Sequence, residues 1–147
     1  MEAIRQFRQD VGRDNSLYIH LTLVPFIGTA GELKTKPTQH SVRDLRSIGI
    51  QPDILLCRTD RYLDPDIKRK IALFCDVAEE AVITAKDVPT IYEVPLVLAA
   101  EGLDTIVLKY LHLPQTEPRM QKWEELVGRI KNPKDDITIH EIGRAHV

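Results

Sequence analysis

Several features that would assign the chain to a specialised class of protein are scarce or absent. It has only two cysteines, Cys57 and Cys75, both in apolar surroundings. This excludes a disulfide-rich scaffold and predicts two reduced, packed thiols, although sequence alone leaves a single disulfide open. Neither cysteine has a second cysteine or a histidine at metal-ligand spacing, so no zinc site is predicted. No apolar run could span a bilayer, because the best one, residues 17–27, is interrupted by His20 and Pro25.

Strong charge and the common catalytic motifs are lacking too. The formal net charge is −2, which gives no general reason to expect nucleic acid or a membrane as a partner. The N-terminus is charged and has no signal-peptide apolar core, so we expect a cytoplasmic protein. The sequence contains no Ser-His-Asp pattern and no G-x-x-x-x-G-K-[ST] phosphate loop. Any anion-binding site must therefore be local.

What is present indicates one α/β domain with a mostly parallel sheet. Of the 147 residues, 43% are hydrophobic, and helical and strand patterns alternate along the chain. The strand expected over 17–24 is apolar on both faces apart from His20 and Thr22, as if helices covered both sides of the sheet. Gly12, Gly49 and Gly102 are expected ends of helical segments. The remaining expectations are strands at 54–57 and 81–84, helices from Pro37, Asp64, Thr90 and Trp123, a linker at 114–118, and a further strand or a new domain beginning at 137–139.

The loop of residues 31–41 is the most informative segment for chemistry. It follows a buried strand and precedes a helix, which is where ligands bind in open α/β sheets. Lys34 and Lys36 lie close together without a carboxylate after Glu32. The hydroxyls of Thr35, Thr38 and Ser41 and the free N–H groups of the helix start complete the parts needed to hold a triphosphate. An exposed polar loop with a capping threonine explains the same composition about equally well.

Other candidates are weaker when each is taken alone. Lys70 borders an apolar helical stripe formed by Ile67, Ile71 and Phe74, where a lysine usually extends to water along the core edge. Residues 86–88, Lys-Asp-Val, follow the third strand and fit an ordinary polar β–α loop. His20 fits a hydrogen-bonded core histidine better than a catalyst. His40 is the better histidine candidate for a site because it lies in the loop.

Residues 34–42, Lys-Thr-Lys-Pro-Thr-Gln-His-Ser-Val, resemble a signature of the CTP synthase family word for word. Further segments are similar to family segments, in the family's order and spacing. The resemblance covers residues 2 to about 139, and four matching words in order make chance a poor explanation. The further segments are 20–25, 47–55, 70–75 and 86–88.

The resemblance implies a partial P-loop-type, Rossmann-like three-layer fold. It implies an enzyme that aminates UTP to CTP: ATP phosphorylates the 4-oxygen of uracil, and ammonia displaces that phosphate. The ammonia comes from glutamine, split in a separate glutaminase domain. Magnesium serves as a cofactor, and the synthetase half works as a homotetramer with the pyrimidine nucleotide near subunit interfaces.

The resemblance also implies site residues. The segment of Lys34, Thr35, Lys36, Pro37, Thr38 and Gln39 would contact UTP or the product CTP, with help from Lys70. Lys86, Asp87 and Val88 would contact ATP around adenine and ribose. Two loop lysines and one helical lysine can converge on one polyanion. No catalytic residue and no metal ligand is assigned in this chain.

The family pattern gives the expected domain limits. Residues 1–139 resemble part of the synthetase domain. Its phosphate loop and acidic magnesium ligands would lie before Glu2, and the glutaminase domain, with its nucleophilic cysteine, would follow Ile139. Neither cysteine of this chain resembles that nucleophile. Residues 140–147 depart from the family, and codons allowed for 142–147 can spell a common sequencing adapter. We hypothesise adapter read-through, which a different codon string in the nucleotide read would refute.

Two functions remain open on these residues. One is a fragment of CTP synthase that is inactive by itself. The other is a stand-alone regulatory module that binds UTP or CTP without catalysis. Upstream codons for a glycine-rich loop would support the first function, and an in-frame stop just before Met1 would support the second.

Overall fold

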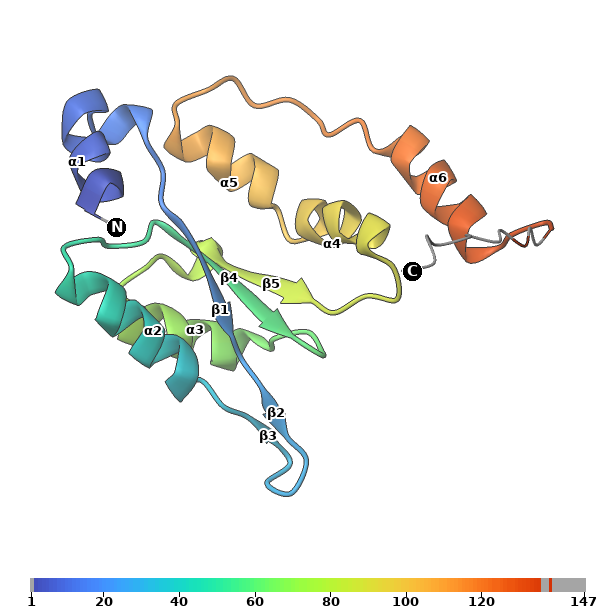
Figure 1. Cartoon of the computed structure of the whole chain (residues 1–147), viewed down its shortest axis with the longest axis horizontal. Helices are drawn as coiled ribbons and strands as arrows, with labels where there is room; N and C mark the ends of the chain where they lie inside the picture. The colour runs from blue at the N-terminus through green and yellow to red at the C-terminus, as the bar shows by residue number, and fades with distance from the viewer. Residues whose placement is uncertain (1, 136–137, 139–147) are drawn as a thin grey trace, which may run out of the picture.

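A computed structural model of the chain describes residues 2–135 and 138 and shows a three-stranded parallel sheet (Figure 1). The strand order is β1-β4-β5, so β1 and β5 form the edges. Register is continuous across the sheet: Leu21 of β1 pairs with Leu56 of β4, which pairs with Ile83 of β5. The strands are β1 (Ile19–Leu23), β4 (Ile54–Thr59) and β5 (Val82–Lys86).

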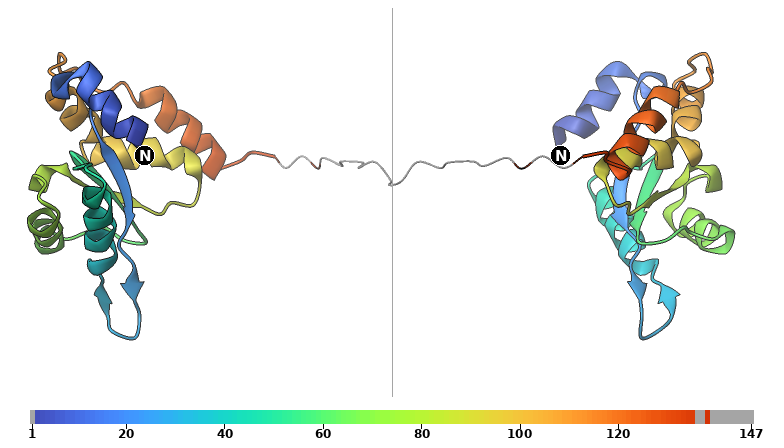
Figure 2. Two further views of the ribbon diagram at one scale, coloured as in Figure 1. Left: turned by 60° about the vertical axis from the view of Figure 1, so that its left-hand side comes forward. Right: turned by 90° about the vertical axis from the view of Figure 1, so that its right-hand side faces the viewer.

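Helices lie on both faces of this sheet, which confirms the three-layer α/β architecture (Figure 1 and Figure 2). On one face are α2 (Lys36–Ser47) and α3 (Pro65–Cys75), and on the other are α4 (Val94–Ala100) and α5 (Leu103–Tyr110). The remaining helices are α1 (Glu2–Val11) and α6 (Gln121–Lys131), with short 3-10 turns η1 (Arg13–Asn15), η2 (Glu79–Ala81) and η3 (Ile91–Glu93). No helix among the described residues is long and apolar enough to cross a bilayer.

The face under α2 and α3 holds the larger core cluster. Each strand contributes to it: Val24 directly follows β1, Leu55 belongs to β4 and Val82 belongs to β5. The helices add Val42 and Ile71. Both cysteines are free and buried in this cluster, as the composition predicted. Burial raises the pKa of the Cys57 thiol to about 11, so this thiol stays protonated at neutral pH.

The face under α4 and α5 is only partly covered, which corrects one expectation. Ile54, Ala81, Ile83 and Ile106 form a second buried cluster beneath these helices. The α4 helix packs on β5, however, and the side chains of β1 on this face remain exposed. Leu21 is 63% exposed and Leu23 is 54% exposed. The prediction that helices cover both sides of β1 was therefore wrong.

Helix ends follow the sequence signals closely. The Asp64 carboxylate accepts a hydrogen bond from the N–H of Ile67 at 2.8 Å and caps α3, with Pro65 in the first turn. Gly12 and Gly49 follow α1 and α2 with φ of 86° and 84°, a left-handed region that favours glycine. Pro95 lies in the first turn of α4, where a missing N–H costs little, so it does not interrupt that helix.

Several elements differ from their predicted form. The loop before α2 contains a small antiparallel hairpin, β2 (Phe26–Ile27) and β3 (Glu32–Leu33). Gly102 ends one helix but also begins α5, which the sequence did not predict. Phe74 is exposed, and the buried side of α3 is instead formed by Ile71, Ala72 and Cys75.

The C-terminal region is described in part. Residues 113–120 have no helix or strand, in agreement with the predicted linker, and α6 follows as predicted. Residues 137 and 139, on which a further strand was expected, and the 140–147 segment lie outside the described residues.

Candidate nucleotide-binding site

The two segments predicted to bind nucleotides, residues 34–39 and 86–88, lie on the side of the sheet where the strands end. Since β1, β4 and β5 run in parallel, their carboxyl ends lie at the same edge. The chain leaves β1 through the hairpin and enters residues 34–39, whereas β5 runs directly into residues 86–88 (Figure 1). The fold thus brings segments about fifty residues apart in sequence to one side of the molecule.

Lysines gather around Glu32 in the first segment. Lys34 forms a salt bridge with the Glu32 carboxylate. The hydrogen bond and charge of Lys34 lower the pKa of Glu32, and the positive charge of Lys70 lowers it further. Glu32 therefore neutralises part of the positive charge of Lys34, a pairing that sequence reasoning missed.

The hydroxyls of this segment turn inward, unlike the prediction that they face a ligand. Thr38 is fully buried and donates a hydrogen bond to the Leu23 carbonyl at 3.0 Å. Thr35 is buried too, and its Oγ1 accepts a hydrogen bond from Gln39 Nε2 at 3.0 Å. Ser41 Oγ is hydrogen-bonded to His20 Nε2 at 2.8 Å. These contacts fix the start of α2 and turn its hydroxyls away from solvent.

The first turn of α2 offers an anion the Lys36 ammonium group and the N-terminal end of the helix dipole. Lys36 and Pro37 are exposed at the helix start, and Thr35 makes no side-chain capping bond to the described residues. First-turn N–H groups have no partner within their own helix, and the helix dipole favours negative charge there. The N–H group of Lys36 can therefore support a phosphate beside the lysine side chains.

The two histidines of this region have different surroundings. His20 is half-buried, its pKa is lowered by burial, and its Nε2 is hydrogen-bonded to Ser41. Its ring is therefore satisfied as expected, although it belongs to neither core cluster. His40 belongs to α2 and is exposed there, so its expected position in a loop was wrong.

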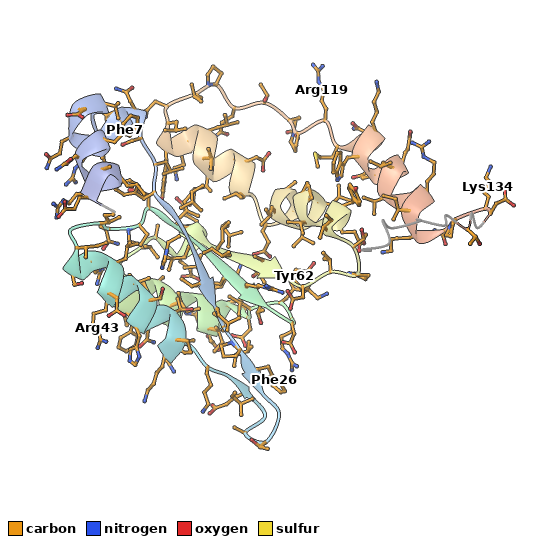
Figure 3. The ribbon with its side chains drawn as sticks, viewed as in Figure 1. Phe7, Phe26, Arg43, Tyr62, Arg119 and Lys134 are labelled. Atoms are coloured by element: carbon orange, nitrogen blue, oxygen red, sulfur yellow. The ribbon has the colours of Figure 1, made fainter. Side chains whose placement is uncertain are left out.

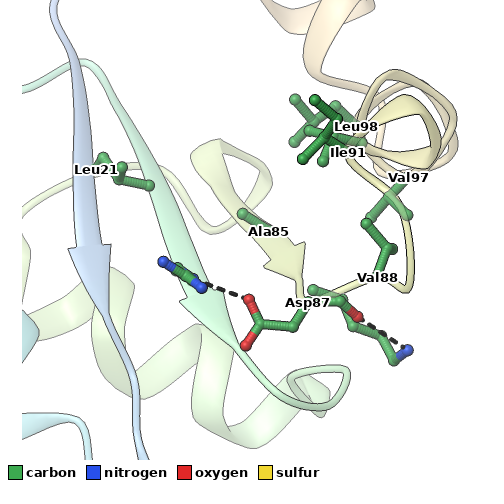
Figure 4. Close-up of a pocket in the computed structure, with 10 residues that line it drawn as sticks. Leu21, Ala85, Asp87, Val88, Ile91, Val97 and Leu98 are labelled. Carbon is green, nitrogen blue, oxygen red and sulfur yellow. Dashed lines mark hydrogen bonds and ion pairs between the residues drawn. The ribbon is translucent and has the colours of Figure 1, made fainter. Parts of the chain in front are cut away.

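The second segment forms the rim of an open hollow of about 320 Å³ (Figure 4). The Asp87 carboxylate accepts a hydrogen bond from Arg58 Nε at 2.8 Å across the rim. The Asp87 N–H donates to the Thr59 carbonyl at 2.8 Å, which fixes the turn after β5. Apolar side chains complete the wall: Leu21, Ala85, Val88, Ile91, Val94, Val97 and Leu98.

Aromatic and cationic side chains lie near this rim. Lys86 Nζ is 5.7 Å from the centroid of the exposed Tyr62 ring, and the Arg61 guanidinium lies 3.3 Å over the Phe26 ring. Figure 3 labels Tyr62 near the carboxyl ends of the strands and Phe26 at the hairpin. An apolar wall with a charged rim suits a flat base whose sugar and phosphates reach the polar edge.

Comparison with known proteins now decides the family. The family described as CTP synthase N-terminus matches residues 1–113. The chain belongs to this family. It is 65% identical to a CTP synthase of Koribacter versatilis and 61% identical to one of Acidobacterium capsulatum. It is 58% identical to a CTP synthase of Methanocaldococcus jannaschii.

Each of these matches covers 98% of the chain but only 26% or 27% of the relative. The chain therefore spans about a quarter of the length of the curated CTP synthases it matches. The resemblance noted for residues 34–42 and 86–88 thus belongs to a similarity that extends over almost the whole chain.

The structure adds residues that the family signatures did not indicate. Arg58 lies near the carboxyl end of β4 and holds Asp87, and the wall of the hollow contains Leu21. A charged residue near the end of an otherwise buried strand was a usable signal for Arg58. The position of Leu21 had no such signal, because its exposure depends on which helices cover β1.

Within the described residues, no group of three or more His, Cys, Asp or Glu side chains is placed to hold a metal ion. Asp87 is paired with Arg58, and Glu32 with Lys34. These residues do not fit the magnesium that the family implies.

Proposed function

We propose that this chain is part of the synthetase half of a CTP synthase, a carbon–nitrogen ligase of pyrimidine nucleotide synthesis. The enzyme would aminate UTP to CTP at the expense of ATP, with nitrogen from ammonia or glutamine. In the whole enzyme we expect a cytoplasmic homotetramer. The observation that carries the proposal is the placement of residues 34–39, with their two lysines, and of an apolar hollow on the side where the parallel strands end.

The lysine cluster is proposed to hold the triphosphate of UTP or CTP. Lys34 is paired with Glu32, Lys70 belongs to the neighbouring helix α3, and Lys36 is exposed at the start of α2. A polyphosphate has more negative charge than one carboxylate, so it can displace Glu32 from Lys34. Thr35, Pro37, Thr38 and Gln39 would contribute through the backbone and by fixing the helix start, since the hydroxyls of Thr35 and Thr38 face inward.

The hollow is proposed to hold the adenine and ribose of ATP. The wall accepts a flat apolar group, and Lys86, Asp87 and Val88 line it at the turn after β5. Arg58 keeps the Asp87 carboxylate directed along the rim. In this arrangement the residues of the chain bind and orient the two nucleotides: ATP phosphorylates the uracil 4-oxygen, and ammonia then displaces that phosphate.

The test measures steady-state kinetics in a full-length enzyme that contains this segment. Lys34→Ala or Lys36→Ala should raise the KM for UTP by about tenfold or more, because each removes a charge-assisted contact to phosphate. Asp87→Ala should raise the KM for ATP more than the KM for UTP. Lys134→Ala is the control, since Lys134 is exposed after the end of α6 and does not line the hollow.

Unchanged UTP kinetics in both lysine variants would refute the pyrimidine assignment. A larger effect of Asp87→Ala on UTP than on ATP would show that the two sites are exchanged.

A further inference from the structure

Helix α6 depends on contacts with other elements for its position. It has 11 residues and follows residues 113–120, which have neither helix nor strand. Isolated helices shorter than about 12–15 residues are marginal in water. Its place beside α4 and the connection after β5 (Figure 1) must therefore come from tertiary contacts.

Three of those contacts join α6 to the short turn η3. Trp123 Nε1 donates a hydrogen bond to the Tyr92 carbonyl at 2.7 Å, and the two aromatic rings lie 6.4 Å apart between centroids. About two turns further along α6, Lys131 Nζ lies 2.6 Å from Glu93 Oε1. Two successive residues of η3 are thus held from α6 by a ring contact, a hydrogen bond and an ion pair.

The same turn forms a wall of the nucleotide hollow from its other side. Ile91 precedes the two gripped residues and Val94 follows them, and both line the hollow. The Thr90 hydroxyl accepts the Tyr92 N–H at 3.5 Å, which anchors the start of the turn. A displacement of residues 92–93 must therefore move the wall on either side of them.

We infer that α6 is a clamp on the hollow, in which Trp123 and Lys131 are positioning residues that hold the Ile91–Val94 wall in its binding shape. The inference rests on the proposed function in so far as the hollow takes an adenine nucleotide. Neither clamp residue lines the hollow, so both act on a ligand only through η3.

Substitution of Lys131 tests the clamp more directly than substitution of Trp123, because the partner of Lys131, Glu93, is largely buried. The Glu93 side chain is 16% exposed, and its Oε2 has no hydrogen-bond partner among the described residues. Removal of the Lys131 charge leaves a poorly hydrated carboxylate without its ion pair. The turn must then open to admit water, which distorts the wall at Ile91 and Val94.

The experiment uses the 147-residue chain with three substitutions. Lys131→Gln breaks the clamp, Lys131→Arg preserves the charge, and Lys109→Gln breaks an exposed ion pair of similar length, to Glu80 at 2.7 Å, outside the hollow. Calorimetry gives the Kd for ATP and, separately, for UTP. Amide hydrogen exchange follows residues 90–94. Trp123 is the only tryptophan, so its fluorescence gives a third readout of the clamp.

Lys131→Gln should raise the Kd for ATP by about fivefold and leave that for UTP unchanged, as expected of an indirect coupling. It should also speed exchange at residues 90–94. Lys131→Arg should restore both, and Lys109→Gln should change neither. ATP, but not UTP, should alter Trp123 emission.

Unchanged exchange at 90–94 in Lys131→Gln would overturn the clamp, and so would faster exchange with an unaltered Kd for ATP. Equal weakening of ATP and UTP would mean a general loss of fold, which also overturns it. If the unmodified chain bound no ATP, the assignment of the hollow would fail instead, and the exchange comparison would decide the clamp by itself.

Discussion

The two faces of the sheet differ in how completely they are covered, although β4 and β5 are largely apolar on both. On the α2/α3 face, β1, β4 and β5 all lie against one continuous cluster that includes Leu55. On the α4/α5 face the helices cover β4 and β5 but leave Leu21 and Leu23 of β1 exposed. The hollow opens on this half-covered face, between Leu21 and α4.

The difference separates stability from binding. A closely covered face stabilises the fold but has no room for a ligand, because packed interiors leave few voids. A half-covered face offers an apolar surface that a flat ligand can occupy, and it also exposes leucines to other chains. The predictions below test this division of roles, starting with the largest expected effect.

The largest expected effect is a complete lack of CTP synthesis by the chain alone, even if the half-covered face binds nucleotide. We expect the 147-residue chain to make no CTP from ATP, UTP, magnesium and ammonium, as followed by nucleotide chromatography. Phosphoryl transfer requires positioned phosphates and a bound metal. The sequence has no G-x-x-x-x-G-K-[ST] loop, and the described residues gather no metal-binding group. CTP formed above the no-protein control, in proportion to protein added, would contradict this expectation.

The second prediction compares one leucine from each face. Leu55→Ala removes a fully buried side chain from the covered face and should lower the free energy of unfolding by about 3 kcal/mol through the lost burial and the cavity. Leu23→Ala, on the half-covered face, should lower it by less than about 0.5 kcal/mol. Urea unfolding followed by circular dichroism measures both. Equal losses would show that the faces do not differ in this way.

Much of the fold was predictable because its signals are local. The cap at Asp64, the glycines after α1 and α2 and the alternation of elements depend on a few neighbouring residues. The coverage of β1 was not predictable, since the same apolar pattern of residues 17–24 fits a covered strand and an exposed one. The helix α5 was missed for a related reason: Gly102 was interpreted as an end, and a glycine at φ of 78° serves equally at a helix start.

The site was predictable by segment but not by side-chain direction. Residues 34–39 and 86–88 do lie at the carboxyl ends of strands, as the order of elements implied. The inward hydrogen bonds of Thr35 and Thr38, the pairing of Lys34 with Glu32 and the Arg58–Asp87 contact depend on tertiary structure. Sequence spacing alone carries no information on them. The role of each residue with nucleotide stays a prediction until the kinetics are measured.

The third prediction concerns the link between the two faces. Glu101 Oε2 accepts hydrogen bonds from Lys68 of α3 at 2.7 Å and from the Thr84 N–H of β5 at 2.8 Å. Burial raises the pKa of Glu101, but the bonds from Lys68 and Thr84 outweigh it and hold the pKa below the usual 4.5. The folded state thus favours the carboxylate, so this stability is full above pH 4.5 and is lost as the pH falls through the lower folded pKa.

Glu101→Gln should therefore lower the free energy of unfolding by about 1–2 kcal/mol at pH 7 and reduce the loss of stability on acidification. Urea unfolding at pH 7 and at a series of pH values below 4.5 measures the effect. Glu80→Gln breaks an exposed ion pair and is the matched control, with a smaller expected change. An acid dependence as steep in Glu101→Gln as in the unmodified chain would refute the assignment.

The smallest expected change in stability comes from Leu21→Lys, but it tests what the exposed face of β1 does in solution. Among the described strands, none pairs with the outer edge of β1, and Ile19, Leu21 and Leu23 are exposed along it. An apolar edge strand without charged side chains promotes pairing with other chains. We expect the unmodified chain to self-associate with increasing concentration, as measured by sedimentation velocity. Leu21→Lys should reduce that association and change the free energy of unfolding by less than about 0.5 kcal/mol.

Leu73→Lys, on the exposed side of α3, is the control, because Leu73 is as accessible but lies on a helix with no open backbone edge. If Leu73→Lys reduced association and Leu21→Lys did not, the contact surface would be α3, and the half-covered face would be open only to small ligands.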